Sequence, residues 1–251
     1  MSLKNKINKA LTKFGVELHG ISYLQSLAKG DFKNDEIEFL TKLYGNKEIL
    51  IYDVGANKGI MIEKFNNHFP KSHIHAFEPY EEYADMIKTK FGDNKKIVIN
   101  QLGISNQTGT LSFNVNKSID TSSFLDSKKT GLNSDASVET IKQVTVPITK
   151  IDTYAANNSH EKIHLLKLDI QGSELNALKG AEKLLKEGKI DCIFSETYFI
   201  QQYIDQPTFF DIANYLLTLG YVVQDIYHPI YGNGKLAWCD TLFVRQNVKY
   251  E

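Results

Sequence analysis

Two carboxylates in this chain stand beside short apolar segments in a pattern that suits a nucleotide-like cofactor. Asp53 lies within the apolar run at residues 49–54, which stops at a turn that contains Gly55 and Gly59. Glycine tolerates positive φ and lets a ligand approach the backbone, so this run predicts a buried parallel strand that leads into a tight turn and a helix. Glu78 ends the next apolar run, where a carboxylate can accept hydrogen bonds from both hydroxyls of a ribose. The structural alternative is that Asp53 caps a helix and Glu78 is a solvated strand end.

The spacing of the glycines separates two classes of cofactor. Dinucleotide sites favour Gly-x-Gly-x-x-Gly, in which the second glycine lets the pyrophosphate approach the backbone. This chain has only Gly55 and Gly59 in the turn and places Asn57 where the second glycine would be. S-adenosylmethionine carries no phosphate, and its positive sulfonium and amino-acid tail suit the acidic Asp53. The turn therefore favours S-adenosylmethionine, with Asn57 among the residues that hold it.

Three carboxylates further along the chain are candidates for catalysis. Asp169 and Glu196 end apolar runs, and Glu174 follows Gly172 in the first turn of an expected helix. The carboxyl ends of parallel strands meet at one edge of the sheet, where ligands of open α/β folds bind. Methyl transfer from a sulfonium needs an aligned acceptor atom, and an acceptor that carries a proton also needs a group that takes it. We predict Asp169, Glu174 and Glu196 for this role, with Asp169 favoured because it is expected closest to the cofactor.

Other roles for these carboxylates stay open. Asp169 and Glu196 would suit Mg²⁺ if they shared it, since this ion is commonly held by one or two carboxylates plus waters. The sequence offers no third ligand at a telling spacing, so no metal site is predicted. Glu174 alternatively stabilises a helix N-terminus through the helix dipole, which is a structural role.

Strands and helices must alternate to bring these residues together. Residues 58–69 and 80–91 have helical patterns, and residues 97–101 read as the following strand. The backbone of Gly103 and Ile104, just beyond that strand, is expected to pass under the adenine of the cofactor.

The end of the chain reads differently. Residues 173–187 predict a helix, but residues 221–227 and 238–245 are expected strands with no helix between them. Two strands joined by a short turn form an antiparallel hairpin. The expected sheet therefore has seven strands, mostly parallel, with the last strand antiparallel.

Residues 105–146 interrupt the alternation. Residues 110–115 and 143–147 predict two strands, and the stretch between them is rich in Ser, Asp, Lys and Thr. Such a long polar insertion in a compact domain is usually functional or disordered. We interpret it as an inserted hairpin that lids the active site, with Ser122 and Ser123 on the cofactor side. A surface loop without function is the alternative.

The start of the chain has a pattern of its own. Apolar residues recur at spacings of four and three from Ile7 to Ile21 and predict an amphipathic helix with lysines around it. The predicted organisation is a helical extension at residues 1–45 and one domain at residues 46–251. We expect the extension to pack on that domain or on a second copy of the chain, so a homo-oligomer through this helix stays open. A basic amphipathic helix on a membrane surface is the alternative, although Gly15 and Gly20 interrupt the pattern and its apolar face has no Trp.

The motifs together resemble a known family. They occur in the family's order and are Asp53-Val-Gly-Ala-Asn-Lys-Gly59, Phe77-Glu78-Pro79, Leu166-Lys-Leu-Asp-Ile-Gln-Gly-Ser-Glu174, Gly180 and Glu196. Over about residues 48–245 the chain looks like the FkbM-type S-adenosylmethionine-dependent methyltransferases. The resemblance implies a Rossmann-like methyltransferase sheet, with Pro79 beside Glu78 at the cofactor.

The resemblance also implies the reaction. S-adenosylmethionine would give its methyl group to a hydroxyl of a sugar, glycan or secondary metabolite and leave as S-adenosylhomocysteine. Two positions depart from the family pattern, because Gln171 stands where Glu is usual and Ser173 where Ala is frequent. The departure at 171 weakens any role that would need a carboxylate there.

Composition limits the partners. The chain has 251 residues and a formal net charge of −1, which gives no field to attract nucleic acid or an anionic membrane. No run of about 18 apolar residues is present, and the N-terminus lacks an apolar signal core. We expect a soluble, cytoplasmic protein without stable membrane insertion, whose partner is a small-molecule or glycan hydroxyl acceptor. The alternatives are a nicotinamide-dependent dehydrogenase and a non-catalytic scaffold that kept the cofactor fold.

Overall fold

The structure is a computed structural model that describes residues 36–128 and 138–246. The chain divides into two units, Met1–Glu38 and Phe39–Glu251, and both sheets belong to the second. The predicted N-terminal helix, and an oligomer formed through it, fall on residues outside the described ranges and stay predictions. Among the described helices the first is α3 (Glu36–Tyr44).

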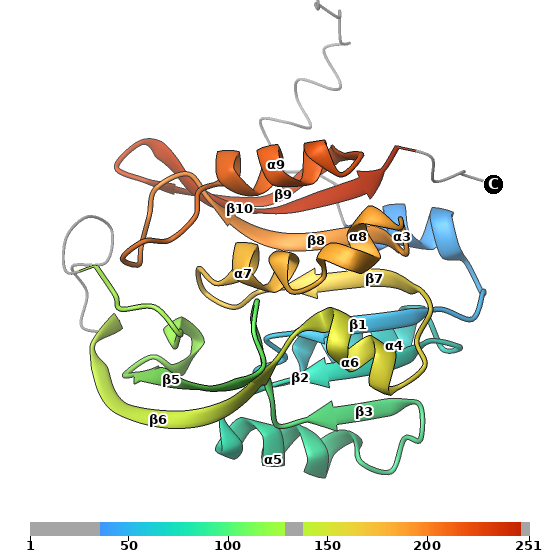
Figure 1. The fold of residues 1–251 in the computed structure, drawn as a ribbon, viewed down its shortest axis with the longest axis horizontal. Coiled ribbons are helices and arrows are strands. Elements are labelled where there is room, and N and C mark those ends of the chain that lie inside the picture. Colours follow the sequence, from blue (N-terminus) through green and yellow to red (C-terminus); the bar gives the residue numbers. More distant parts are fainter. Residues whose placement is uncertain (1–35, 129–137, 247–251) are drawn as a thin grey trace, which may run out of the picture. The chain divides into compact units, whose positions relative to one another are not determined.

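A seven-stranded sheet forms the fold, in the order β3-β2-β1-β7-β8-β10-β9 (Figure 1). Neighbouring strands are parallel from β3 to β8, and β10 is antiparallel to β8 and to β9. This confirms the predicted sheet and its closing hairpin. The strands of this sheet are β1 (Leu50–Val54), β2 (His73–Phe77), β3 (Ile97–Asn100), β7 (Ile163–Leu168), β8 (Ile190–Tyr198), β9 (Tyr221–Gly232) and β10 (Lys235–Arg245).

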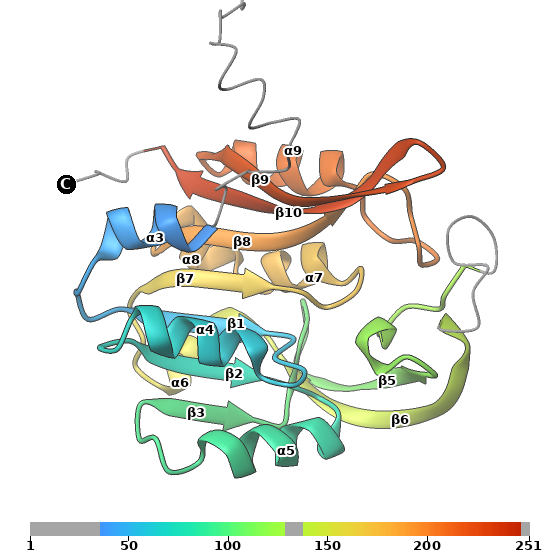
Figure 2. The same ribbon diagram turned by 180° about the vertical axis from the view of Figure 1, so that it is seen from behind.

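Helices cover both faces of the sheet. One group lies on one face (Figure 2) and another on the opposite face (Figure 1). Central strand residues such as Ile51, Leu166 and Ile193 are fully buried as a result. Burial on both faces explains why these strands read as continuous apolar runs rather than as alternating ones. The helices are α4 (Ile60–His68) and α5 (Glu81–Phe91) on the first face, and α6 (Ile151–Asn157), α7 (Glu174–Lys179), α8 (Glu182–Lys186) and α9 (Phe209–Thr218) on the second.

Two helices differ from their predictions. The single helix predicted at residues 173–187 is split into α7 and α8 at Gly180. The backbone of Gly180 packs so closely on the carbonyl of Ser105 that a Cβ there would overlap it. Helix α6 was not predicted, because in seven residues it buries only Ile151 and Ala155, too few for a clear periodic pattern.

A second, three-stranded sheet lies at the carboxyl ends of the parallel strands (Figure 1). It contains β4 (Gly103–Ile104), β5 (Gly109–Asn116) and β6 (Thr140–Thr149) in the order β4-β6-β5, and a short 3-10 helix, η2 (Ile119–Thr121), follows β5. The two strands expected inside the polar insertion are therefore present as β5 and β6. Part of the segment between them, residues 129–137, lies outside the described ranges.

No helix within residues 36–128 and 138–246 is long and apolar enough to cross a membrane.

Candidate active site

A glycine turn joins β1 to α4 and brings two strands into contact. Gly55 has φ +82°, and a Cβ at this position would overlap the carbonyl oxygen of Asp169. Gly59 has φ +76° and caps α4, close to the ring of Phe91. Both positions need glycine, because side chains rarely adopt positive φ and no space is left for one. The turn thus places the end of β1 directly against the end of β7.

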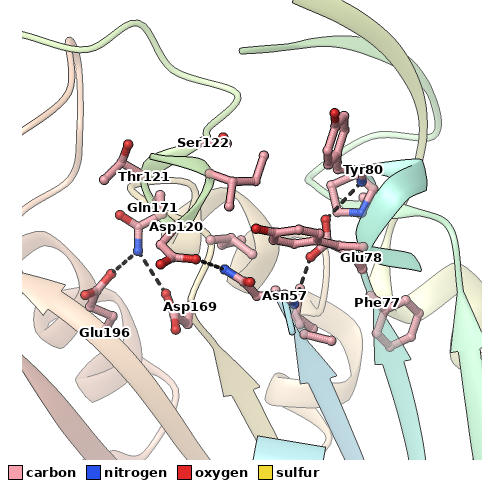
Figure 3. Close-up of a pocket in the computed structure, with 18 of the residues that line it drawn as sticks. Asn57, Phe77, Glu78, Tyr80, Asp120, Thr121, Ser122, Asp169, Gln171 and Glu196 are labelled. Atoms are coloured by element: carbon pink, nitrogen blue, oxygen red, sulfur yellow. Dashed lines mark hydrogen bonds between the residues drawn. The ribbon is translucent and has the colours of Figure 1, made fainter. Parts of the chain in front are cut away.

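A cavity of about 530 Å³ opens at this edge of the sheet. Of the residues predicted to bind the cofactor or to act in catalysis, Asp53, Gly59 and Glu174 do not line it. Figure 3 shows the side chains of several that do. The predicted residues that line the cavity are Gly55, Asn57, Glu78, Pro79, Gly103, Ile104, Asp169 and Glu196.

Glu78 is fixed by the backbone at the end of β2. Its Oε2 accepts the backbone N–H of Asn57 at 2.9 Å, and its Oε1 accepts that of Tyr80 at 2.9 Å (Figure 3). Burial raises the pKa of Glu78 to about 7, against the lowering effect of these two hydrogen bonds. Each oxygen keeps a lone pair for a further donor in the cavity.

Asp53 is paired with a buried lysine, Lys167, which the sequence motifs did not single out. Lys167 Nζ lies 3.1 Å from Asp53 Oδ1, donates to the carbonyl of Gly55 at 2.8 Å, and lies 3.6 Å from Asp169 Oδ2. Burial raises the pKa of Asp53, and Lys167 opposes that shift. For Lys167 itself burial lowers the pKa, but Asp53 and Asp169 outweigh it and the net shift is upward. The lysine is therefore charged, and it ties the glycine turn to both carboxylates.

Glu174 faces the protein rather than the cavity. Its Oε1 accepts the backbone N–H of Ile170 at 3.0 Å and that of Gly172 at 3.2 Å. The side chain is 1% exposed, and burial raises its pKa to about 7. Glu174 thus stabilises the turn between β7 and α7 by hydrogen bonds to the backbone of the turn.

Asp169 and Glu196 meet through Gln171. The amide nitrogen of Gln171 donates to Asp169 Oδ1 at 2.9 Å and to Glu196 Oε2 at 2.8 Å (Figure 3). Tyr198 donates its hydroxyl to the same oxygen of Glu196 at 2.6 Å. Burial and the nearby Asp169 raise the pKa of Glu196 well above its ordinary value, although Tyr198 opposes the shift.

The space between these two carboxylates holds an amide nitrogen, so the geometry is that of hydrogen bonding. Across the described parts of the chain, no group of three or more His, Cys, Asp and Glu side chains is arranged to hold a metal ion. The arrangement of Asp169 and Glu196 thus gives no support to the Mg²⁺ alternative.

The segment after β5 lies over both halves of the cavity. On the cofactor side, Asp120 Oδ1 accepts from the amide of Asn57 at 3.0 Å and from Lys58 Nζ at 3.1 Å. On the other side, Ser123 donates to the carbonyl of Gln171 at 2.6 Å, while Ser122 lines the cavity. The role of this segment as a lid stays a prediction.

Aromatic side chains line the cavity beside Glu196 and Gln171. Tyr198, Tyr203 and Trp238 line it, and the rings of Tyr198 and Trp238 are stacked with centroids 6.1 Å apart. Sequence reasoning missed these residues, because each lies beyond the motifs and only the fold of β8, β10 and the loop after β8 brings them to the site.

Comparison with known proteins gives the family. The profile of the methyltransferase FkbM domain matches residues 53–223. The 2-O-methyltransferase NoeI of Sinorhizobium fredii is 23% identical over 152 residues, which are 58% of this chain and 63% of that protein. This chain therefore spans less than two thirds of the length of that relative.

A solved methyltransferase structure shows the same fold at low identity. Magnesium protoporphyrin IX methyltransferase from Synechocystis PCC 6803 aligns with a TM-score of 0.50 at 9% identity and covers 98% of both chains. An rRNA methylase from Streptococcus thermophilus aligns with a TM-score of 0.46 at 13% identity, over 84% of this chain and 94% of that one. Because the FkbM profile covers more than half of the sequence, this chain belongs to the FkbM methyltransferase family.

Proposed function

We propose that this protein transfers the methyl group of S-adenosylmethionine to a hydroxyl oxygen of an uncharged sugar, glycan or secondary metabolite. The observation that carries the proposal is that one cavity joins the glycine turn and Glu78 to the carboxylates Asp169 and Glu196. The first half suits a ribose and an amino-acid tail, and the second suits a hydroxyl that must lose its proton. The relative NoeI, named a 2-O-methyltransferase, supports oxygen as the acceptor atom.

The residues around the turn fit the cofactor. Glu78 would hold the ribose hydroxyls, because it lines the cavity and each of its two oxygens accepts one backbone hydrogen bond, which leaves a lone pair on each. Asn57 Oδ1 is buried and has no hydrogen-bond partner among the described residues, so a donor from the ligand would satisfy it. The backbone of Gly103 and the side chain of Ile104 offer an apolar surface to a base. When bound, S-adenosylmethionine supplies a methyl group made electrophilic by its positive sulfur.

The charges in the cavity favour an acceptor without negative charge. Asp169 and Glu196 would repel an anion. Two lysines line the cavity, but Lys58 is paired with Asp120 and Lys167 with Asp53. Phosphorylated or carboxylated acceptors would thus find no unpaired lysine or arginine among the described lining residues.

Glu196 is the better placed of the two carboxylates to take the acceptor proton. Both oxygens of Asp169 are engaged, one by Gln171 and the other by the charged Lys167. Glu196 receives both of its donors on Oε2, which leaves Oε1 for the acceptor hydroxyl. The proton passes to this oxygen as the new carbon–oxygen bond forms and the carbon–sulfur bond breaks. This geometry shifts the preference from Asp169 to Glu196.

Calorimetry tests the choice of cofactor. We expect S-adenosylmethionine and S-adenosylhomocysteine to bind more tightly than NAD, because Asn57 occupies the place where a pyrophosphate needs a glycine. Tighter binding of NAD would contradict the proposal.

Replacing Glu78 with alanine should weaken the binding of S-adenosylmethionine by about tenfold to a hundredfold. Hydrogen bonds to a charged group contribute roughly 1.5–3 kcal/mol, which corresponds to that range. Glu81→Ala is the matched control, since Glu81 is exposed in the first turn of α5 and does not line the cavity. Equal dissociation constants for wild type and Glu78→Ala would show that Glu78 is only a strand-end carboxylate.

The affinity should also depend on pH through Glu78. Ribose hydroxyls donate best to the charged carboxylate, so binding lowers the pKa of Glu78 from about 7 and releases its proton. Affinity should therefore rise with pH below about 7 and level off above it. Calorimetry between about pH 5.5 and 8.5 should compare wild type with Glu78→Gln. The pH dependence of the affinity that the variant loses is due to Glu78. Parallel affinity profiles for the two proteins would contradict the assignment.

A further inference from the structure

Gln171 uses every polar atom of its side chain in the catalytic half of the cavity. The amide nitrogen donates to Asp169 and Glu196, at 2.9 and 2.8 Å. The amide oxygen lies 3.0 Å from the hydroxyl of Tyr203, which can donate to it. It also lies 3.1 Å from the hydroxyl of Tyr198, whose one proton goes to Glu196 at the shorter distance of 2.6 Å. This pattern fixes the orientation of the amide, because the reversed orientation would bring its oxygen against two carboxylates.

The backbone of Gln171 is held just as firmly. The residue has φ +52°, which is uncommon for a residue other than glycine. Its carbonyl accepts a hydrogen bond from the Ser123 hydroxyl at 2.6 Å. The Tyr203 hydroxyl also lies 2.9 Å from the carbonyl oxygen of Thr121, so its one proton is shared between this carbonyl and the Gln171 amide oxygen. Contacts from three parts of the chain thus keep the amide nitrogen between the two carboxylates.

Glu196 needs such a donor because its surroundings favour the neutral acid. Asp169, Glu174 and, on β10, Asp240 all add negative charge near it. Asp240 is the register partner of Glu196 in the sheet. Tyr198 and Gln171 donate to Glu196, and a donor stabilises the charged form of a carboxylate.

We propose that Gln171 is a positioning residue, which favours the charged form of Glu196 and turns its Oε1 toward the acceptor hydroxyl. The inference rests on the proposed function, in which Glu196 takes the acceptor proton. Gln171 itself donates no proton to the substrate; it acts through the two carboxylates that it joins.

Two substitutions test this role against a matched control. Gln171→Glu removes the donor and adds a like charge, whereas Gln171→Met removes the donor alone. Both should raise the pKa of Glu196, so the acid limb of the kcat/KM profile should move to higher pH, by about one to two pH units in Gln171→Glu and by less in Gln171→Met. At pH 7 the rate of Gln171→Glu should be about tenfold lower or more and should recover as the pH rises. Gln107→Glu adds the same charge at an exposed position outside the cavity and should leave the profile unchanged.

A second readout does not depend on turnover. In protein labelled with ¹³C at the glutamate carboxyl carbons, the Glu196 signal is identified by its loss in Glu196→Gln. Its titration midpoint should be higher in Gln171→Glu and Gln171→Met than in wild type. Should Gln171→Glu fail to fold, Gln171→Met carries the test.

The two readouts separate this inference from the proposed function. An unshifted Glu196 titration in a folded Gln171 variant, or an acid limb that stays in place, overturns the role of Gln171. A shifted titration in a protein whose wild type methylates no hydroxyl overturns the proposed function instead, and with it the catalytic part of the inference.

Discussion

Replacing Glu196 with glutamine should lower the turnover of methyl transfer by about 10²–10⁴, the range for a positioned acid or base. Glutamine keeps the size of the side chain but cannot take the acceptor proton at Oε1. The affinity for S-adenosylmethionine should change little, because Glu196 and Glu78 lie on opposite sides of the labelled residues of the cavity (Figure 3). Single-turnover methylation of an identified acceptor, followed across pH, is the measurement. The loss should shrink at high pH, where the acceptor ionises more readily without help.

Asp169→Asn is the comparison variant for this experiment. It also removes one carboxylate from the cavity, but Asp169 is already paired with Lys167 and Gln171. We expect a smaller loss of turnover than in Glu196→Gln. The opposite order would make Asp169 the proton acceptor. Activity that a chelator abolishes and Mg²⁺ restores would instead show that the two carboxylates hold a cation.

Replacing Lys167 with methionine should cost about 3–5 kcal/mol in the free energy of unfolding, the range for breaking a buried ion pair from one side. Methionine fills a similar volume but leaves Asp53, which is 0% exposed, without its charge partner. The carbonyl of Gly55 loses its donor as well. Urea denaturation at pH 7 measures the effect, with Lys95→Met as control, because Lys95 is exposed and outside the site.

The double variant locates the cause of that loss. If an unpaired Asp53 carboxylate is responsible, Lys167→Met combined with Asp53→Asn should be more stable than Lys167→Met alone. Equal stability of the single and double variants would show that the lysine acts through packing. If Lys167→Met is as stable as wild type, the ion pair contributes nothing measurable to the free energy of unfolding.

The sheet could be predicted from the sequence because its strands are buried on both faces. The runs that end at Val54, Phe77 and Leu168 are apolar almost throughout, and glycine or a carboxylate marks the point where each one ends. Parallel strands place those ends at one edge, so Glu78 and Asp169 could be assigned to one site without knowledge of the coordinates. The hairpin of β9 and β10 followed from the missing helix between them.

The contacts that decide the chemistry could not be predicted in the same way. Lys167 reads as a single charge in an apolar strand, and its pairing with Asp53 depends on the register between β1 and β7. In the sequence, Gln171 is only a departure from the family pattern. Its proposed role depends on four side-chain contacts, with residues just after β7, in β8 and in the loop after β8. Glu174 follows the same motif, yet a turn only a few residues long directs it into the protein. Motif spacing places such residues near the site but does not assign their partners.

The most direct test of the proposed reaction is transfer of a ¹³C-labelled methyl group from S-adenosylmethionine to a panel of acceptors, read by carbon NMR of the products. The panel should contain uncharged sugars and other neutral alcohols, each beside its phosphorylated or carboxylated counterpart. We expect a methoxyl carbon signal with a neutral hydroxyl acceptor, its loss in Glu196→Gln, and no signal with the anionic counterparts. A label that appears on nitrogen or carbon, or a wild-type protein that binds the cofactor but labels no hydroxyl in the panel, would contradict O-methylation.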